Sequence, residues 1–248
     1  MLRAAHAAIV REVRDSWRLA TGLVLAFALL AFSLGSSRHA LPALSFGAAS
    51  VPFFALAWLP ASVVDDGSSG LARLIGTQPL PAGAYGLLRI ASASALLLLL
   101  VVPALVCIAL ATATVVQLPR ALVAAAFSTL WAASAAVLLG LRTKGPAAAS
   151  ALWIVLALAN LLAVLRVWSD LYVDWLVRGM HWLPGPAAAE SVATAADPWR
   201  LGALSLLIAQ SLLFLLAAWA ASAGSTRFRV VGLLAALTLP FAAPAVGA

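Results

Sequence analysis

Long apolar runs separated by short polar connections dominate the pattern of this chain. A helix needs about 20 mostly apolar residues to cross the hydrocarbon layer of a membrane. By that measure the sequence predicts six spans, near residues 18–35, 43–64, 86–116, 119–141, 147–165 and 201–223. The last apolar stretch, 230–248, is long enough to cross but is interrupted by Pro240 and Pro244. It is therefore either a seventh span or a segment lying along the membrane.

Composition and charge agree with this pattern. Of the 248 residues, 65% are hydrophobic and only 9% are charged, and the mean hydropathy is +1.08. Soluble domains carry about 25% charged residues. We predict an all-α polytopic membrane protein in which residues 1–248 form one transmembrane domain. The net charge is +7, and the basic residues behind it are scattered singly through short loops. We therefore expect membrane lipid and no nucleic acid as a partner.

The basic residues also predict an orientation. Lys and Arg are retained on the cytoplasmic side of short loops. With the N-terminus inside, ten basic residues lie inside and five outside, which accounts for all 15. We expect a cytoplasmic N-terminus in the inner membrane of a bacterium or archaeon, with the break at 65–85 also on the cytoplasmic face. The five outside residues are Arg38, Arg120, Arg166, Arg178 and Arg200.

Residues 1–17 predict a helix that lies in the membrane surface ahead of the first span. Their apolar side chains recur at roughly helical spacing and end at Trp17, whereas Glu12 and Arg14 are charged. The segment does not resemble a cleavable signal, because arginines alternate with acids and no small-residue exit follows the apolar run.

The connection 166–200, outside in this topology, predicts a second interfacial helix. Its aromatic residues share one helical face, while its charged residues follow each other at spacings of four on another. Aromatic side chains are enriched at the level of the lipid headgroups. Anchoring is the preferred interpretation, and gripping a substrate is the alternative. The aromatic residues are Trp168, Tyr172, Trp175 and Trp182.

The polar break at 65–82 contains "DDGSSGLARLIGTQPLP". Ser68 and Ser69 are good residues to begin a helix, and the preceding acids would complement its positive end. An apolar edge follows at spacings of three and four, and Pro79 ends the pattern. We predict a short amphipathic helix that projects into the cytoplasm. It either rests on the lipid surface or inserts into a groove of a partner. The edge consists of Leu71, Leu74 and Ile75.

This stretch resembles the signature that follows the second span in permeases of the type-2 ABC exporter family. The pattern is an acid, three residues, Gly, eight residues, Pro, nine residues, then Lys or Arg. Here it falls on Asp66, Gly70, Pro79 and Arg89. The N-terminal "VREVRDSWR" is similar to the family's basic and acidic lead-in. The chain departs from the family after the glycine, where Leu71 replaces Thr or Ser, and two residues later, where Arg73 replaces an acid.

The resemblance implies the membrane subunit of an ATP-driven exporter. Two permease chains, as a homodimer or heterodimer, would stand above two cytoplasmic ATPase subunits that bind ATP and Mg. The 66–79 helix would be the coupling helix lodged in each ATPase, and the cargo would move outward. The chain has no phosphate-binding loop, so hydrolysis is expected in the partner. The expected docking residues are Asp66, Gly70, Leu71, Arg73, Leu74, Ile75, Pro79 and Arg89.

Three other interpretations stay open. The haem-exporter permease of cytochrome c maturation has a similar acid–glycine and "PLP" signature but is usually shorter. A force-transmitting scaffold would use 166–200 to contact an accessory protein outside the membrane. An intramembrane enzyme is disfavoured, because the three histidines lie far apart and no motif for a catalytic, cofactor or metal site occurs. The apolar spans weakly favour an amphipathic or lipid-like cargo.

Overall fold

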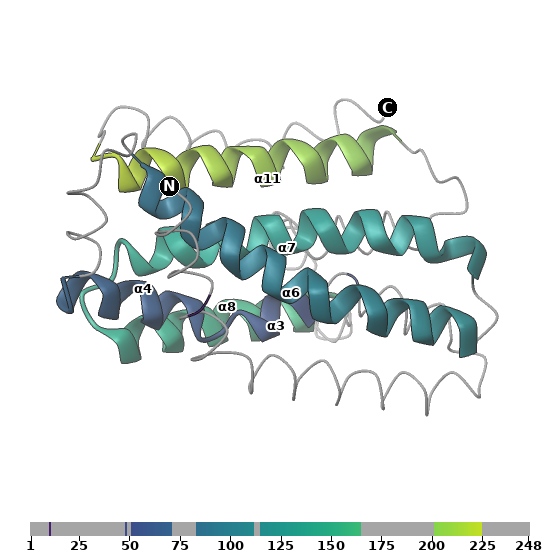
Figure 1. Cartoon of the computed structure of the whole chain (residues 1–248), viewed down its shortest axis with the longest axis horizontal. Coiled ribbons are helices and arrows are strands. Elements are labelled where there is room, and N and C mark those ends of the chain that lie inside the picture. The colour runs from purple at the N-terminus through teal and green to yellow at the C-terminus, as the bar shows by residue number, and fades with distance from the viewer. Residues whose placement is uncertain are drawn as a thin grey trace, which may run out of the picture.

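Helices and the turns between them make up the described part of this protein, whose structure is a computed structural model. The described residues are 51–70, 83–111, 115–164 and 201–224, together with Val10 and Ala48. The helices are α3 (Val51–Ala55), α4 (Leu59–Ser68), α6 (Ala84–Ala111), the 3₁₀ helix η1 (Val115–Gln117), α7 (Leu118–Gly140), α8 (Pro146–Val164) and α11 (Leu201–Ser222) (Figure 1). The prediction of an all-α fold is confirmed for these residues.

Two stretches of helix are long and apolar enough to cross a membrane. They are α6, with 28 residues, and the 26 residues Val115–Gly140, which join η1 to α7. The helices α8 and α11 begin and end within one residue of the apolar runs 147–165 and 201–223. The prediction of six spans otherwise stays a prediction, since the runs 18–35 and 230–248 lie outside the described residues.

The predicted span 43–64 is not one continuous helix. Residues 56–58 form a turn between α3 and α4, in which the amide of Leu59 bonds to the carbonyl of Leu56 at 3.0 Å. In an unbroken helix that carbonyl would accept from residue 60, but Pro60 has no N–H and its ring clashes with the preceding turn. Proline therefore explains the interruption, which the count of apolar residues did not reveal.

The end of α4 also corrects the sequence analysis. Ser68 and Ser69 do not begin a helix: their hydroxyls donate to the carbonyls of Asp65 and Asp66, at 2.9 and 3.4 Å, in the last turn of α4. Gly70 follows with a φ of +79°, the left-handed conformation in which glycine commonly ends a helix. Ser and Asp are found at both the N-terminal and the C-terminal ends of helices. Here Gly70 shows that Ser68 and Ser69 stand at a C-terminal end. Residues 66–68 of the predicted helix 66–79 thus belong to the end of α4, and residues 71–79 lie outside the described part of the chain.

The helices run back and forth, so that five of them share one end of the bundle. The helices α4, α7 and α11 finish there, and α6 and α8 begin there, at the left in Figure 1. We call this the basal end. It carries the described parts of the connections predicted to be cytoplasmic, although the side of the membrane that it faces stays a prediction.

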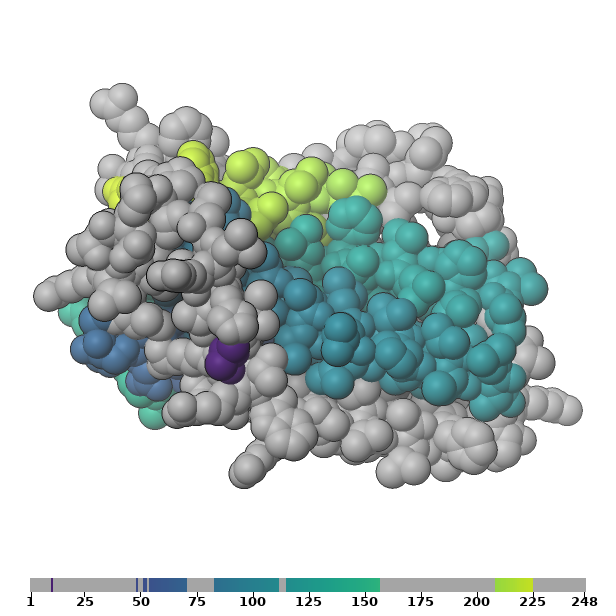
Figure 2. All heavy atoms as spheres, viewed as in Figure 1, coloured from purple at the N-terminus to yellow at the C-terminus, as the bar shows by residue number. Residues whose placement is uncertain are grey.

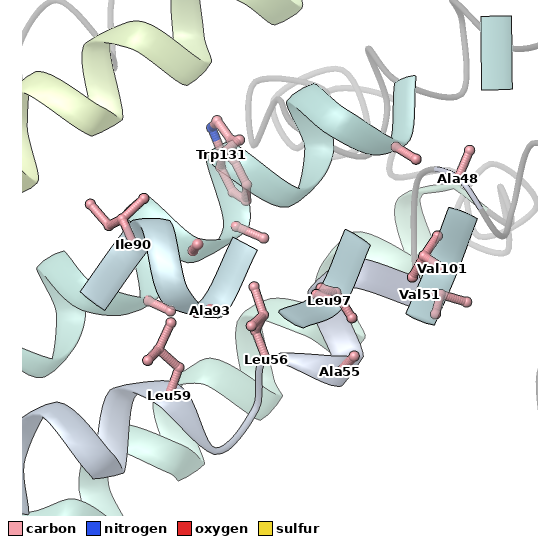
Figure 3. Packing of buried hydrophobic residues seen from close by; sticks show 14 of the residues in the cluster. Ala48, Val51, Ala55, Leu56, Leu59, Ile90, Ala93, Leu97, Val101 and Trp131 are labelled. Carbon is pink, nitrogen blue, oxygen red and sulfur yellow. The ribbon is translucent and has the colours of Figure 1, made fainter. Parts of the chain in front are cut away.

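The core is built around α7, which packs against α3, α4, α6, α8 and α11. Leu56 and Leu59 belong to one buried apolar cluster with Ile90 and Leu97 of α6 and Trp131 of α7 (Figure 3). Many of the buried residues of α7 are alanine or serine. Small residues let helix backbones approach closely, which is the usual way that helices associate in a membrane.

The outward faces of the bundle are apolar as well. On α6, Leu99 is 73% exposed and Leu110 is 66% exposed, and on α8 Val155 is 63% exposed. Figure 2 shows α6, α7 and α11 side by side on one face of the molecule. Large apolar side chains exposed along several helices mark a surface that contacts either lipid or another protein.

Gly140, the last residue of α7, lies at a close contact between α7 and α4. A Cβ atom there would lie 2.6 Å from the carbonyl oxygen of Pro60 and 2.7 Å from Cβ of Val63. Both obstacles are backbone or belong to a stiff β-branched residue, so neither can move aside cheaply. The glycine therefore sets the distance between the two helices at the basal end.

Replacing Gly140 with alanine is expected to lower the free energy of unfolding by roughly 1–3 kcal/mol, because the added methyl group overpacks this contact. Gly67→Ala is the matched control, since Gly67 is also helical and a Cβ there meets nothing within 4 Å. It should leave stability unchanged or raise it. Thermal unfolding in detergent compares the two variants. Equal stability would show that α4 and α7 are not held together at this point.

Candidate functional site at the basal end

A buried ion pair joins α4 to α6 at the basal end. The Nε atom of Arg89 lies 3.0 Å from Oδ2 of Asp66, and the two side chains are 2% and 0% exposed. They are 23 positions apart in the chain and lie on either side of residues 71–82. Asp66 and Arg89, the first and last residues of the spacing that resembles the exporter signature, are thus in direct contact.

Two hydroxyl groups complete this cluster. Tyr85 donates a hydrogen bond of 2.9 Å to Oδ2 of Asp66, and Nη2 of Arg89 donates to the hydroxyl of Ser62. Each helix contributes two residues at a spacing of four, which places them on one face, one turn apart. We call Ser62, Asp66, Tyr85 and Arg89 the basal cluster.

Burial explains why the basal cluster must be complete. An isolated carboxylate or guanidinium removed from water is very unfavourable, so buried charges occur in pairs that are also hydrogen-bonded. Such a pair adds little net stability compared with apolar residues of the same size, but removing one member leaves the other uncompensated. The main effect of the cluster is therefore on geometry: it fixes α4 against the first two turns of α6.

A second contact holds the start of α6 against the end of α11. Gly83 has a φ of +84°, and a Cβ atom there would lie 2.5 Å from the ring of Trp219. At Gly86 a Cβ would lie 2.7 Å from Oγ of Ser222. This hydroxyl lies 3.0 Å from the carbonyl oxygen of Gly83 and 2.9 Å from that of Trp219, and it donates to both. The chain is thus fixed just before and just after residues 71–82.

The structure places some of the residues predicted from the sequence and not others. It brings Asp66 and Arg89 together and puts Gly70 just after α4. Other predicted residues lie outside the described part of the chain: Leu71, Arg73, Leu74, Ile75 and Pro79 of the break, Glu12, Arg14 and Trp17 of the first interfacial helix, and Trp168, Tyr172, Trp175 and Trp182 of the second.

Sequence reasoning missed Ser62 and Tyr85. Both stand four residues before a charged residue, which is the one signal that could have singled them out. It also missed the glycine contacts of α6 with α11, which depend on tertiary packing. Within the described residues, no group of three His, Cys, Asp or Glu side chains could hold a metal ion.

Comparison with known proteins adds no further information about this site. No family model matches the chain, and no curated protein is similar to it.

Replacing Arg89 with methionine is expected to lower the free energy of unfolding by roughly 3–5 kcal/mol, because the Asp66 carboxylate stays buried without its cation. The double variant Asp66→Leu/Arg89→Met should recover much of this loss, since neither charge is then buried. The control is Asp65→Asn at the neighbouring exposed acid, which should change stability little. Equal unfolding midpoints for the Arg89 variant and this control would show that the pair is not buried as described.

Proposed function

We propose that this chain is the membrane subunit of an ATP-driven exporter, with its ATPase bound to residues 66–79. One observation carries the proposal. Asp66 and Arg89, the first and last positions of the exporter-like spacing, form a buried ion pair that encloses the proposed docking segment. If this spacing had arisen by chance, there would be no reason for its first and last residues to be in contact.

The geometry supports a division of roles within the signature. Asp66 and Arg89 are buried, so their side chains do not offer a surface to a partner. Their role is to hold the base of the docking segment, and the contact itself falls to the apolar edge formed by Leu71, Leu74 and Ile75. A segment held at both ends loses less conformational entropy on binding than a loose loop.

Attachment to several helices would let a docked ATPase act on the membrane domain. The segment leaves α4, which packs against α7 and α8, and returns through Gly83, which contacts Trp219 of α11. Movement of the segment would therefore be passed to these helices directly. The energy would come from ATP hydrolysis in the partner, and a second permease chain would complete the path for an amphipathic cargo.

The test is retention of the ATPase. The tagged chain, purified in mild detergent from the cells that make it, should bring with it a subunit that carries a phosphate-binding loop and hydrolyses ATP. Leu74→Asp or Ile75→Asp should remove this subunit, because a charge on the apolar edge cannot be buried in a groove. Mass spectrometry and ATP hydrolysis in the eluate measure the loss.

Gly76→Asp is the matched control, since in the proposed helix it adds the same charge at least about 100° away from each of Leu71, Leu74 and Ile75. It should retain the ATPase, and all variants should unfold at the temperature of the natural chain. If both edge variants keep the ATPase, residues 66–79 are not the docking segment. If the natural chain brings no such subunit, the exporter function itself is wrong.

A further inference from the structure

Gln210 of α11 is a long polar side chain in the middle of the bundle. It is fully buried, and neither its amide nitrogen nor its amide oxygen has a hydrogen-bond partner in the part of the chain that the structure describes. Buried polar groups are nearly always hydrogen-bonded, more strictly so within a membrane. An amide in this state indicates a partner that the chain itself does not supply.

The neighbours of Gln210 show which interface it belongs to. The next residue, Ser211, donates a hydrogen bond of 3.0 Å to the carbonyl of Phe127 in α7. One turn further on, at a spacing of four, the ring of Phe214 packs against Trp131, with 5.1 Å between the ring centroids. Residues four apart share a helix face. Gln210 therefore lies on the face of α11 that packs against α7, near the middle of α7.

The facing part of α7 is lined by short side chains. Ala121, Ala124 and Ser128 are buried and share a face at spacings of three and four. Ala124 and Ser128 each stand three residues before Phe127 and Trp131, the two residues that contact α11. A stripe of small residues is common between membrane helices, but here a buried amide without a partner is set against it. We call Gln210, Ala121, Ala124 and Ser128 the α7–α11 seam.

We infer that the α7–α11 seam binds the hydroxyl group of an uncharged amphipathic molecule. A hydroxyl both donates and accepts, so it can pair with the oxygen and the nitrogen of the Gln210 amide at once. A charged group does not fit, since the described residues of α6 and α7 that carry a charge at neutral pH, Arg89 and Arg120, lie near the helix ends. The rest of the ligand would lie against apolar helix surface.

This inference rests on the proposed function in one respect, because it takes the amphipathic molecule to be the exported cargo. It makes the cargo a neutral, hydroxyl-bearing lipid-like molecule. Entry of such a molecule requires α7 and α11 to separate, since Gln210 is fully buried in this structure.

The test uses octanol that carries a photoreactive diazirine on its alkyl chain. The chain alone, without an ATPase, is placed in nanodiscs of phosphatidylcholine, irradiated with this probe and mapped by mass spectrometry. We expect labelling in α7 and α11 around Gln210, competed by 1-octanol but not by its methyl ether, which cannot donate a hydrogen bond. Gln210→Met should lower this labelling about tenfold.

Gln117→Met is the matched control, because it makes the same change in η1, at the end of the bundle away from the basal end. It should leave the labelling as it is. Gln210→Met should unfold at the same temperature as the natural chain or higher, because an apolar side chain of similar shape removes the unpartnered amide. Labelling that survives Gln210→Met, or that spreads evenly over outward residues such as Leu99 and Val155, overturns the inference.

A lower unfolding temperature for Gln210→Met also overturns it, because the amide would then have a structural role. The ATPase takes no part in this assay, so its outcome is separate from that of the docking experiment. A labelled seam in a chain that retains no ATPase would leave the binding site in place and remove the exporter function.

Discussion

The buried pair of Asp66 and Arg89 is the constraint on which the basal end depends. Removing either ion from water costs several kcal/mol, so α6 can bury Arg89 only where α4 presents Asp66. This requirement fixes the register of α4 against α6. The other close contacts are compatible with that register: Gly140 lets α7 approach α4, and Gly86 lets α11 approach α6. Charge therefore sets the position, and small residues make it sterically possible.

The existence of the long helices could be predicted from the sequence, because each coincides with an apolar run of about 19 residues or more. The interruptions of these helices were harder to predict. Pro60 stands inside an apolar run, where its effect depends on one lost hydrogen bond rather than on hydropathy. Ser68 and Ser69 have the chemistry of either helix end. Only the left-handed Gly70 decides between the two, and a positive φ cannot be read from composition.

Much of the candidate site was beyond sequence reasoning for a similar reason. A spacing pattern singled out Asp66 and Arg89, but nothing in a separation of 23 residues says that their side chains meet. Contact follows from the return of the chain to the basal end, where the start of α6 comes within side-chain reach of the end of α4. The approach of Gly83 and Gly86 to α11 joins positions more than 130 residues apart, as the bond from Ser222 to Gly83 shows. Such contacts are tertiary, and neither local propensity nor helical periodicity contains them.

Two of the buried polar side chains in the described part of the bundle, Asp66 and Gln210, differ in their hydrogen-bond partners. In the basal cluster, Oδ2 of Asp66 accepts from Tyr85 and pairs with Arg89 of the same chain. Both polar atoms of the Gln210 amide are without a hydrogen-bond partner among the described residues, although the side chain is equally buried. Consistency between local chemistry and fold is the rule in natural sequences, and departures from it concentrate at functional sites. By this argument the basal cluster holds the helices in place, and we propose the α7–α11 seam as the place where they bind a ligand.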